Sequence, residues 1–195
     1  MADLMSGIDV LISEVGPRDG LQSIESIMSS GAKKDWIKAE FDAGVREIEV
    51  GSFVPPKILP QLADTGEIVS FATGIPDLQV AALVPNFKGA ENAINAGAHK
   101  ITLPISISEA HSIANLRKTH QQVFEEVNKI VNLIRSLPED KKPHFEGSLS
   151  TAFGCTIEGK VEQKKVVQIA EKLIEMGCDE VGLADTTGYA NPYQI

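Results

Sequence analysis

The sequence is poor in cysteine and in basic residues, and it has no long apolar run. Two cysteines, Cys155 and Cys178, are too few for a disulfide framework and favour a reducing, cytoplasmic compartment. Lys and Arg number 18 against 27 Asp and Glu, and this net charge of −9 argues against nucleic acid as the main partner. No apolar segment reaches the roughly 18 residues that a membrane span needs, so no membrane partner is expected.

Several common signatures are also missing. The opening residues resemble neither a secretion signal nor a transit peptide. No G-x-G-x-x-G follows the first predicted strand, and the sequence contains no P-loop, no H-E-x-x-H and no Ser-His-Asp order. These absences argue against a doubly wound dinucleotide-binding sheet and leave the chemistry to other residues.

What the sequence does contain is a repeated alternation of strand and helix patterns. Six segments are predicted as strands, at 10–15, 45–50, 78–84, 100–107 (broken by Pro104), 144–153 and 179–184. Five helices are predicted between them, at 32–43, about 61–71, 88–95, 120–137 and 162–176, with one more beginning at Asn191-Pro192. In the longest helix, Val123, Val127, Ile130, Val131 and Ile134 have the spacing of one buried face.

Glycines at three predicted helix ends support a single repeated unit. Gly44, Gly97 and Gly177 each follow an apolar helix end and precede a strand, where a left-handed residue turns the chain back. The alternation predicts βαβ units and a parallel sheet. A TIM (β/α) barrel, class α/β, fits better than a doubly wound sheet, and its chemistry lies where strands end and βα loops begin.

The first strand ends in a charged pair, Arg18 and Asp19, braced by glycine and proline. Arg supplies fixed donors for a carboxylate or an enolate oxygen, and Asp can bind a hard divalent metal or act as a base. An ordinary solvated loop is an equally good interpretation from spacing alone. On the second strand, Glu47 and Glu49 share a face, and a glutamate pointing inward would need Arg18 as its partner.

Later strand ends carry further candidates. Ser108 and His111 follow the fourth strand and either contact a polar substrate or cap the next segment through Ser108. Asp185 follows the sixth strand and either orients a metal ligand or Arg18, or caps a helix. The remaining candidates are interpreted as structural: His99, His120, His144, Cys155 and Cys178. A catalytic role for Cys155 is a minor alternative.

Together these strand ends resemble the hydroxymethylglutaryl-CoA lyases, a branch of the barrel metallolyases with an Arg-Asp pair after strand one. Glu-Val-Gly-Pro-Arg-Asp-Gly-Leu-Gln at 14–22 closely resembles the family's opening signature. Further segments follow in the family's order: Ile-Glu at 48–49 with Ser-Phe-Val at 52–54 and Pro-Lys at 56–57, Pro-Asn at 85–86 with Lys-Gly at 88–89, Gly-Cys at 154–155 with Glu-Gly at 158–159, and Asp-Thr at 185–186 with Gly188.

The resemblance implies a TIM barrel that cleaves 3-hydroxy-3-methylglutaryl-CoA, or a close 3-hydroxyacyl-CoA, into acetyl-CoA and acetoacetate. It also implies a divalent metal, Mg²⁺ or Mn²⁺, a homodimer and a place in leucine degradation. The matching positions assign Asp19 as a metal ligand, Arg18 to the thioester enolate, Gln22 and Glu49 to support of that site, Ser108 to the substrate pocket and Asp185 to the neighbourhood of the metal.

Three departures from the family are visible. Ser23-Ile24-Glu25 stands where the family usually has Asn-Glu-Lys, and Gly182 stands where it has a serine. The family's His-x-His pair, metal-binding Asn and loop Cys have no match in these 195 residues. Eight βα units need roughly 250 residues, so we expect residues 1–195 to be a single catalytic barrel domain, incomplete at its C-terminus, with about six units of eight and the remaining metal ligands beyond Ile195.

Two other interpretations stay open. One is a related enzyme of the superfamily, either an isopropylmalate-synthase-like Claisen condensation or a pyruvate-type aldolase. The other is an inactive, truncated barrel fragment, whose open sheet edges would favour self-association. The form of the Gly-Pro-Arg-Asp-Gly-Leu-Gln and Ser-Phe-Val segments favours the lyase over both.

Overall fold

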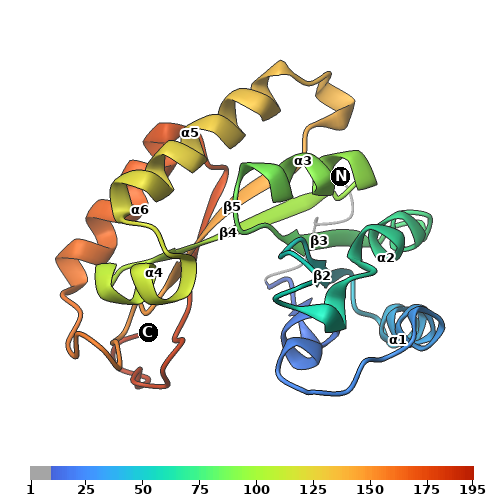
Figure 1. Cartoon of the computed structure of the whole chain (residues 1–195), viewed down its shortest axis with the longest axis horizontal. Helices are drawn as coiled ribbons and strands as arrows, with labels where there is room; N and C mark the ends of the chain where they lie inside the picture. The colour runs from blue at the N-terminus through green and yellow to red at the C-terminus, as the bar shows by residue number, and fades with distance from the viewer. Residues whose placement is uncertain (1–9) are drawn as a thin grey trace. The chain divides into compact units, whose positions relative to one another are not determined.

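Strands and helices alternate along the chain, as the sequence predicts. The computed structural model describes residues 10–195 (Figure 1). Its strands are β1 (Ser13–Glu14), β2 (Glu47–Ser52), β3 (Gln79–Leu83), β4 (Lys100–Ser106), β5 (His144–Ser150) and β6 (Glu180–Leu183). Its α-helices are α1 (Ser30–Asp42), α2 (Thr65–Ala72), α3 (Phe87–Ala96), α4 (Glu109–Leu116), α5 (His120–Ser136) and α6 (Gln163–Met176). Three short helical turns are η1 (Gly16–Gly20), η2 (Pro60–Leu62) and η3 (Glu139–Lys141).

The sheet has the order expected of successive βα units. Its strands lie in chain order, from β1 to β6. β1 pairs with β2, β2 with β3 and β5 with β6, all in parallel. A parallel neighbour requires a crossover, and helices supply it between the strands. The predicted α/β class with a parallel sheet is therefore confirmed.

The described chain divides into two compact units. The first comprises residues 10–84 and 88–101, and the second comprises residues 85–87 and 102–195. Strands β1 to β3 and helices α1 and α2 belong to the first unit. Strands β5 and β6 and helices α4, α5 and α6 belong to the second. The two units are described separately below.

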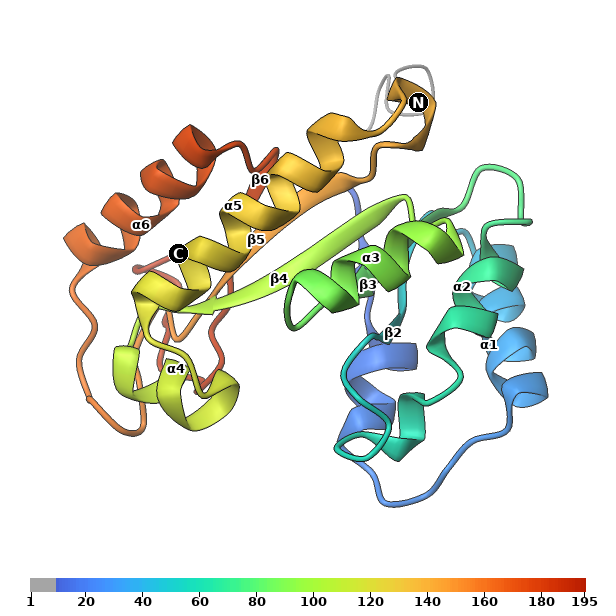
Figure 2. The same ribbon diagram turned by 45° about the horizontal axis from the view of Figure 1, so that its top comes forward.

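In the first unit, β2 is buried along its whole length because helices cover it. Ile37 of α1 and Ile68 and Val69 of α2 are fully or almost fully buried. Helices α1 and α2 lie side by side (Figure 2). Burying each such side chain contributes about 1.5–3 kcal/mol, so this packing anchors the loops that leave β1 and β2.

In the second unit, α5 forms as its apolar spacing predicts. Its N-terminus has a capping box in which the Thr119 hydroxyl accepts the Gln122 N–H and the Gln122 side chain accepts the Thr119 N–H. Of the five residues predicted to form its buried face, Val123, Val127, Ile130 and Val131 are buried and Ile134 is half-buried. Helix α6 lies beside α5 (Figure 2).

The three glycines predicted to end helices adopt the left-handed conformation. Gly44, Gly97 and Gly177 have φ angles of +105°, +92° and +111°. A residue with a Cβ would be strained there, so glycine at these positions is required by the turn into the next strand.

Four local predictions were wrong. Pro104 does not break β4, because its fixed φ is compatible with an extended chain. Residues 109–116 form a helix that the sequence pattern did not indicate, because it is only eight residues long and its Ile113 is exposed. The first strand covers only Ser13–Glu14, and its flanking Val10 and Ile12 are exposed. Asn191-Pro192 leads into a turn and not a helix.

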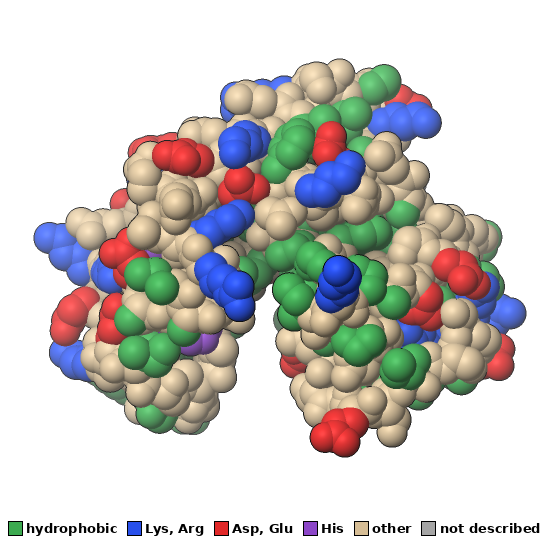
Figure 3. All heavy atoms as spheres, viewed as in Figure 1, with side chains coloured by type: hydrophobic (Ala, Val, Ile, Leu, Met, Phe, Trp, Pro, Cys, Tyr) green, Lys and Arg blue, Asp and Glu red, His purple; other side chains and the backbone are tan. Residues whose placement is uncertain are grey.

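Acidic and basic side chains are interspersed over the face of the molecule drawn in Figure 3. Within residues 10–195, no helix combines the length and the apolar character that crossing a membrane requires.

Candidate active site

The loop after β1 and the strand β2 bring three of the predicted site residues together. The η1 turn places Arg18 so that its Nε donates to a carboxylate oxygen of Glu49 at 2.5 Å. The Nη1 of Arg18 donates to Asp19 at 2.6 Å. The predicted pairing of Arg18 with Glu49 is confirmed, and it unites η1 with β2.

These three side chains differ in how far they are exposed to solvent. The Glu49 side chain is 5% exposed and that of Arg18 is 17% exposed, whereas that of Asp19 is 58% exposed. A buried carboxylate without a cation would be strongly destabilising, so the guanidinium stabilises the buried Glu49 carboxylate and Glu49 in turn holds the guanidinium in place. Asp19 keeps a carboxylate open to solvent beside this fixed cation.

Gln22, the fourth candidate from this loop, is exposed just after η1. The preceding residue, Leu21, is buried in a small apolar cluster with Leu59 and Leu62. Leu21 therefore anchors the loop, and the side chain of Gln22 is left at the surface on the same turn that carries Arg18.

Glu47 has a different partner from Glu49, although the two share a face of β2. Its carboxylate lies 3.7 Å from the Nζ of Lys100, and both side chains are less than 10% exposed. This second ion pair joins the start of β2 to the start of β4, so Glu47 has a structural role.

Ser108 belongs to the second unit and caps a helix, which is one of the two roles that the sequence predicted for it. Its hydroxyl accepts the His111 N–H at 3.0 Å at the N-terminus of α4. The residue is fully buried. The neighbouring Ser106 hydroxyl contacts the Nδ1 of His111 at 2.7 Å. These contacts bind the end of β4 to α4.

The thiol of Cys155 lies in the same hydrogen-bonded cluster. It accepts the backbone N–H groups of Ile157 at 3.3 Å and Glu158 at 3.5 Å. Burial raises the pKa of the Cys155 thiol, but hydrogen bonds from the Ser108 hydroxyl and from these two amides outweigh burial, so that the pKa lies below its ordinary value. The sequence indicated this environment only through the position of Cys155 after a strand.

Glu158 is a member of this cluster to which the sequence analysis assigned no role, although it belongs to one of the family-like segments. Its carboxylate accepts the Ala110 N–H at 2.9 Å, at the start of α4. That hydrogen bond lowers the pKa of Glu158. Cys155 and Gly159 close a short hairpin that turns Glu158 back toward the helix. Recognising this hairpin would have identified Glu158 as a candidate.

Asp185 closes a turn. Its two carboxylate oxygens accept the N–H groups of Tyr189 and Ala190, each at 3.0 Å. The next residue, Thr186, accepts the Thr151 N–H at 2.8 Å through its hydroxyl. The geometry of Asp185 is that of a capping carboxylate, although it caps a turn and not a helix.

Gly182, at the position where the family has a serine, lies against the side chain of Glu146. A Cβ built at Gly182 would lie 2.4 Å from the Oε1 of Glu146. Gly182 of β6 is opposite Ser148 of β5 in the parallel register. In this chain the Glu146 side chain takes up the space beside β6 that a larger residue at position 182 would need.

The histidines and Cys178 have structural environments, as predicted. The Nδ1 of His99 accepts the Val80 N–H, and the Nε2 of His120 contacts the Ser106 carbonyl. His144 pairs with Glu180. Cys178 is buried, and burial raises the pKa of its thiol to about 12.

The described part of the chain does not contain a complete metal site. Within residues 10–195, no three His, Cys, Asp or Glu side chains lie close enough to hold a metal ion together. Asp19 supplies one exposed carboxylate, the type of oxygen ligand that hard divalent cations prefer. The residues present therefore account for one ligand and not for a set.

Comparison with known proteins gives a consistent result. A family model described as HMGL-like matches residues 9–195. The mitochondrial hydroxymethylglutaryl-CoA lyase of Rattus norvegicus is 37% identical over 183 residues, which cover 94% of this chain and 55% of the relative. The hydroxymethylglutaryl-CoA lyase YngG of Bacillus subtilis is 35% identical, with 95% of this chain and 61% of the relative covered. The chain thus spans a little more than half the length of these relatives.

Solved structures agree. An HMG-CoA lyase from Acenitobacter baumannii, in complex with coenzyme A and 3-methylmalate, gives a TM-score of 0.86 at 37% identity, covering 95% of this chain and 59% of that one. The hydroxymethylglutaryl-CoA lyase from Pseudomonas aeruginosa gives 0.86 at 34% identity, covering 93% and 59%. These similarities confirm the predicted α/β fold of the barrel type.

Proposed function

This chain belongs to the HMGL-like family, and on that premise we propose that the whole protein is a carbon–carbon lyase. Its substrate would be 3-hydroxy-3-methylglutaryl-CoA or a close 3-hydroxyacyl-CoA, and its products acetyl-CoA and acetoacetate. The observation that carries this proposal is the Arg18 guanidinium, which two carboxylates hold in place at the end of the first strand.

The geometry suits the cleavage step. Breaking the carbon–carbon bond requires removal of the 3-hydroxyl proton and a cation that stabilises the enolate oxygen of the departing thioester. Arg18 contacts Glu49 through its Nε and Asp19 through its Nη1, and its third nitrogen, Nη2, takes part in neither contact. A guanidinium already fixed by Glu49 needs little rearrangement to donate to an enolate oxygen from that third nitrogen.

A divalent metal, required by hydroxymethylglutaryl-CoA lyases in general, is the second part of the proposal, as Mg²⁺ or Mn²⁺. When bound it would supply a positive charge for the substrate's hydroxyl and carboxylate oxygens. Asp19 would be one ligand among several. The exposure of its carboxylate supports that role. Binding of Gln22, Ser108 and Asp185 to the substrate or near the metal, a homodimer and a part in leucine degradation stay predictions.

The whole protein, incubated with 3-hydroxy-3-methylglutaryl-CoA and Mg²⁺, should release acetyl-CoA and acetoacetate. We expect Arg18→Gln to reduce turnover by about 10²–10³-fold, the effect of losing one donor to a developing oxyanion. Release of neither product by the unaltered protein would contradict the lyase. Consumption of acetyl-CoA with a 2-oxo acid would indicate the Claisen-condensing relative instead.

A second variant separates chemistry from folding. Arg18→Gln alone leaves the buried Glu49 carboxylate without its cation, so part of its effect could come from instability. The double variant Arg18→Gln/Glu49→Gln replaces the ion pair by two neutral amides. It should recover stability in urea denaturation while turnover stays low. Recovery of turnover together with stability would remove Arg18 from the chemistry.

A further inference from the structure

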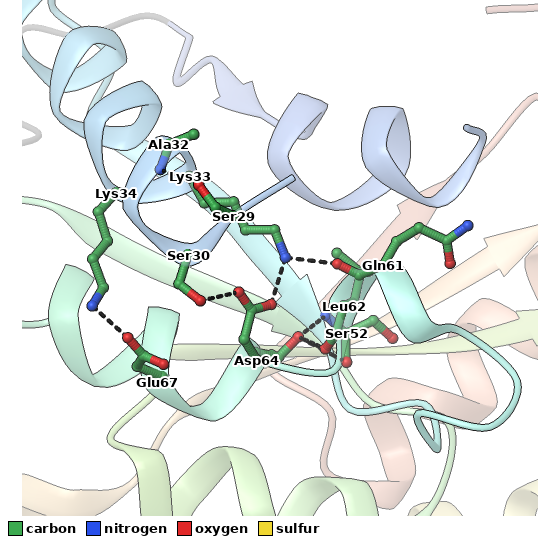
Figure 4. Close-up of polar contacts among 11 residues, drawn as sticks. Ser29, Ser30, Ala32, Lys33, Lys34, Ser52, Gln61, Leu62, Asp64 and Glu67 are labelled. Atoms are coloured by element: carbon green, nitrogen blue, oxygen red, sulfur yellow. Dashed lines mark hydrogen bonds and ion pairs between the residues drawn. The ribbon is translucent and has the colours of Figure 1, made fainter. Parts of the chain in front are cut away.

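A third ion pair with a buried member lies in the first unit, outside the residues discussed above. The Lys33 side chain, on α1, is only 2% exposed. Its Nζ donates to an Asp64 carboxylate oxygen at 2.5 Å and to the Gln61 carbonyl at 2.6 Å (Figure 4). The other Asp64 oxygen accepts the Ser30 hydroxyl at 2.7 Å. Helix α1 thus holds the segment between β2 and α2 by three hydrogen bonds.

The residue after Asp64 continues this connection into the sheet. The Thr65 hydroxyl accepts the Ser52 N–H at 3.1 Å and lies 2.7 Å from the Leu62 carbonyl, to which it can donate. Thr65 also lies so close to β2 that a Cβ at Gly51 would be 2.5 Å from its Oγ1. The end of β2 therefore rests directly on the Thr65 side chain.

This end of β2 is the part of the strand that follows Glu49. The parallel register between β2 and β3 shifts between Glu49 and Ser52, so the regular ladder is interrupted there. An interrupted ladder leaves the backbone without its usual hydrogen bonds, and a side chain has to supply them. Thr65 does this for the Ser52 N–H, three residues from the carboxylate that holds Arg18.

We propose that Lys33, Asp64 and Thr65 form a positioning network for Glu49, and through Glu49 for Arg18. The inference rests on the proposed lyase function, because its purpose is to hold the guanidinium where the enolate oxygen forms. Lys33 and Thr65 are positioning residues that act on Arg18 through the end of β2. The Gln61 side chain extends the network, because its Nε2 donates to the Ile24 carbonyl at 2.6 Å, in the loop that follows η1.

The chain contains a matched control for this network. Lys34, the next residue on α1, pairs with Glu67 of α2 at 2.5 Å, and their side chains are 28% and 57% exposed. Lys34 connects α1 to α2 itself, whereas Lys33 reaches the segment that precedes Thr65 (Figure 4). A loss of general helix packing should affect both lysines, whereas a loss of positioning should affect Lys33 alone.

Hydrogen exchange in the whole protein tests the proposal without an assay of enzyme activity. We expect Thr65→Val, which keeps the shape and removes the hydroxyl, to accelerate exchange of the Ser52 amide about tenfold, since local opening controls exchange. Lys33→Met should accelerate it similarly, and Thr65→Ser and Lys34→Met should leave it as in the unaltered protein. Unchanged exchange in Thr65→Val and Lys33→Met would overturn the inference, as would equal acceleration across the whole first unit.

Steady-state kinetics of the same variants provide a second test. Thr65→Val should reduce kcat about tenfold with KM within about twofold, because misplacing a group needed in the transition state lowers turnover more than binding. Thr65→Ser should restore kcat. An unchanged kcat with accelerated exchange would overturn the positioning role. If the unaltered protein has no lyase activity, the proposed function fails, while the exchange experiment still decides whether the network holds β2. If Lys33→Met does not fold, the Thr65 pair alone decides.

Discussion

The two units bury polar groups in different ways. In the described chain, the buried charged residues all lie in the first unit: Lys33, Glu47, Glu49 and Lys100. The buried polar residues of the second unit all carry hydroxyls: Ser106, Ser108, Ser112 and Thr151. The ion pairs of the second unit involve side chains nearer the solvent, such as Lys129 and Lys160, which are 58% and 83% exposed.

The difference has an energetic consequence. Removing one member of a buried ion pair leaves a lone charge in a medium of low dielectric, which costs about 3–5 kcal/mol. Removing a hydroxyl loses a neutral hydrogen bond, which costs about 1 kcal/mol. The first unit should therefore be sensitive to neutralisation of single residues, and the second unit should tolerate it but resist the creation of a charge.

The largest expected effect is on the pair that joins β2 to β4. Lys100→Met should lower the free energy of unfolding by about 3 kcal/mol, because Glu47 loses a cation that lies 3.7 Å away inside the protein. Urea denaturation measures this change. The matched variant is Lys160→Met, which removes an exposed pair of the second unit and should change the free energy by less than about 0.5 kcal/mol. Equal losses in the two variants would break the comparison.

Much of the fold could be predicted from the sequence, because apolar spacing and glycine positions are local signals. Helices α1, α5 and α6 begin and end within two residues of their predicted bounds. Helix α4 could not be predicted in this way, since it is short and its stability comes from the Ser108 cap and from Glu158, a residue that the fold and not the sequence places beside it.

The site was predictable to the extent that neighbouring strands meet at one edge of a parallel sheet. This rule placed Arg18 beside Glu49. It did not reveal Lys33, because Lys33 and Lys34 look alike in a charged segment at the start of a helix. The helical period separates them: Lys33 lies four residues before Ile37, and both are buried on one face of α1. A lysine on an apolar face thus indicates a buried partner, and Asp64 supplies it from a distant segment.

A smaller effect is expected from Cys178, where the second unit has to accept a charge at high pH. Burial raises the pKa of this thiol from 9.0 to about 12. The unfolded chain loses the thiol proton above pH 9 and the folded chain does not, so the stability that the buried thiol provides is complete below pH 9 and is lost between pH 9 and 12. At pH 10 the unfolding equilibrium constant should therefore be about tenfold higher than it is well below pH 9.

Urea denaturation from pH 8 to 10.5 measures this loss as a difference from Cys178→Ala, since both proteins share every other titrating group. The unaltered protein should lose more stability than the variant over this range. Parallel pH dependences in the two proteins would show that the second unit accepts the thiolate, contrary to the comparison.

The smallest effect is expected at Ser108. If burial of a polar group mattered in the second unit as it does for the charged residues of the first, its removal would cost several kcal/mol. Ser108→Ala removes a buried helix cap and should cost about 1 kcal/mol, against a negligible change for Ser136→Ala, whose exposed hydroxyl only donates to the Leu133 carbonyl. The same variant should raise the pKa of Cys155, because the Ser108 hydroxyl is one of the hydrogen bonds that lower it. The difference in thiolate absorbance between this protein and a matched variant that also carries Cys155→Ala follows Cys155. A loss of stability as large as that of Lys100→Met would show that Ser108 does more than donate and accept neutral hydrogen bonds. An unchanged Cys155 titration would show that the Ser108 hydroxyl does not contact the thiol.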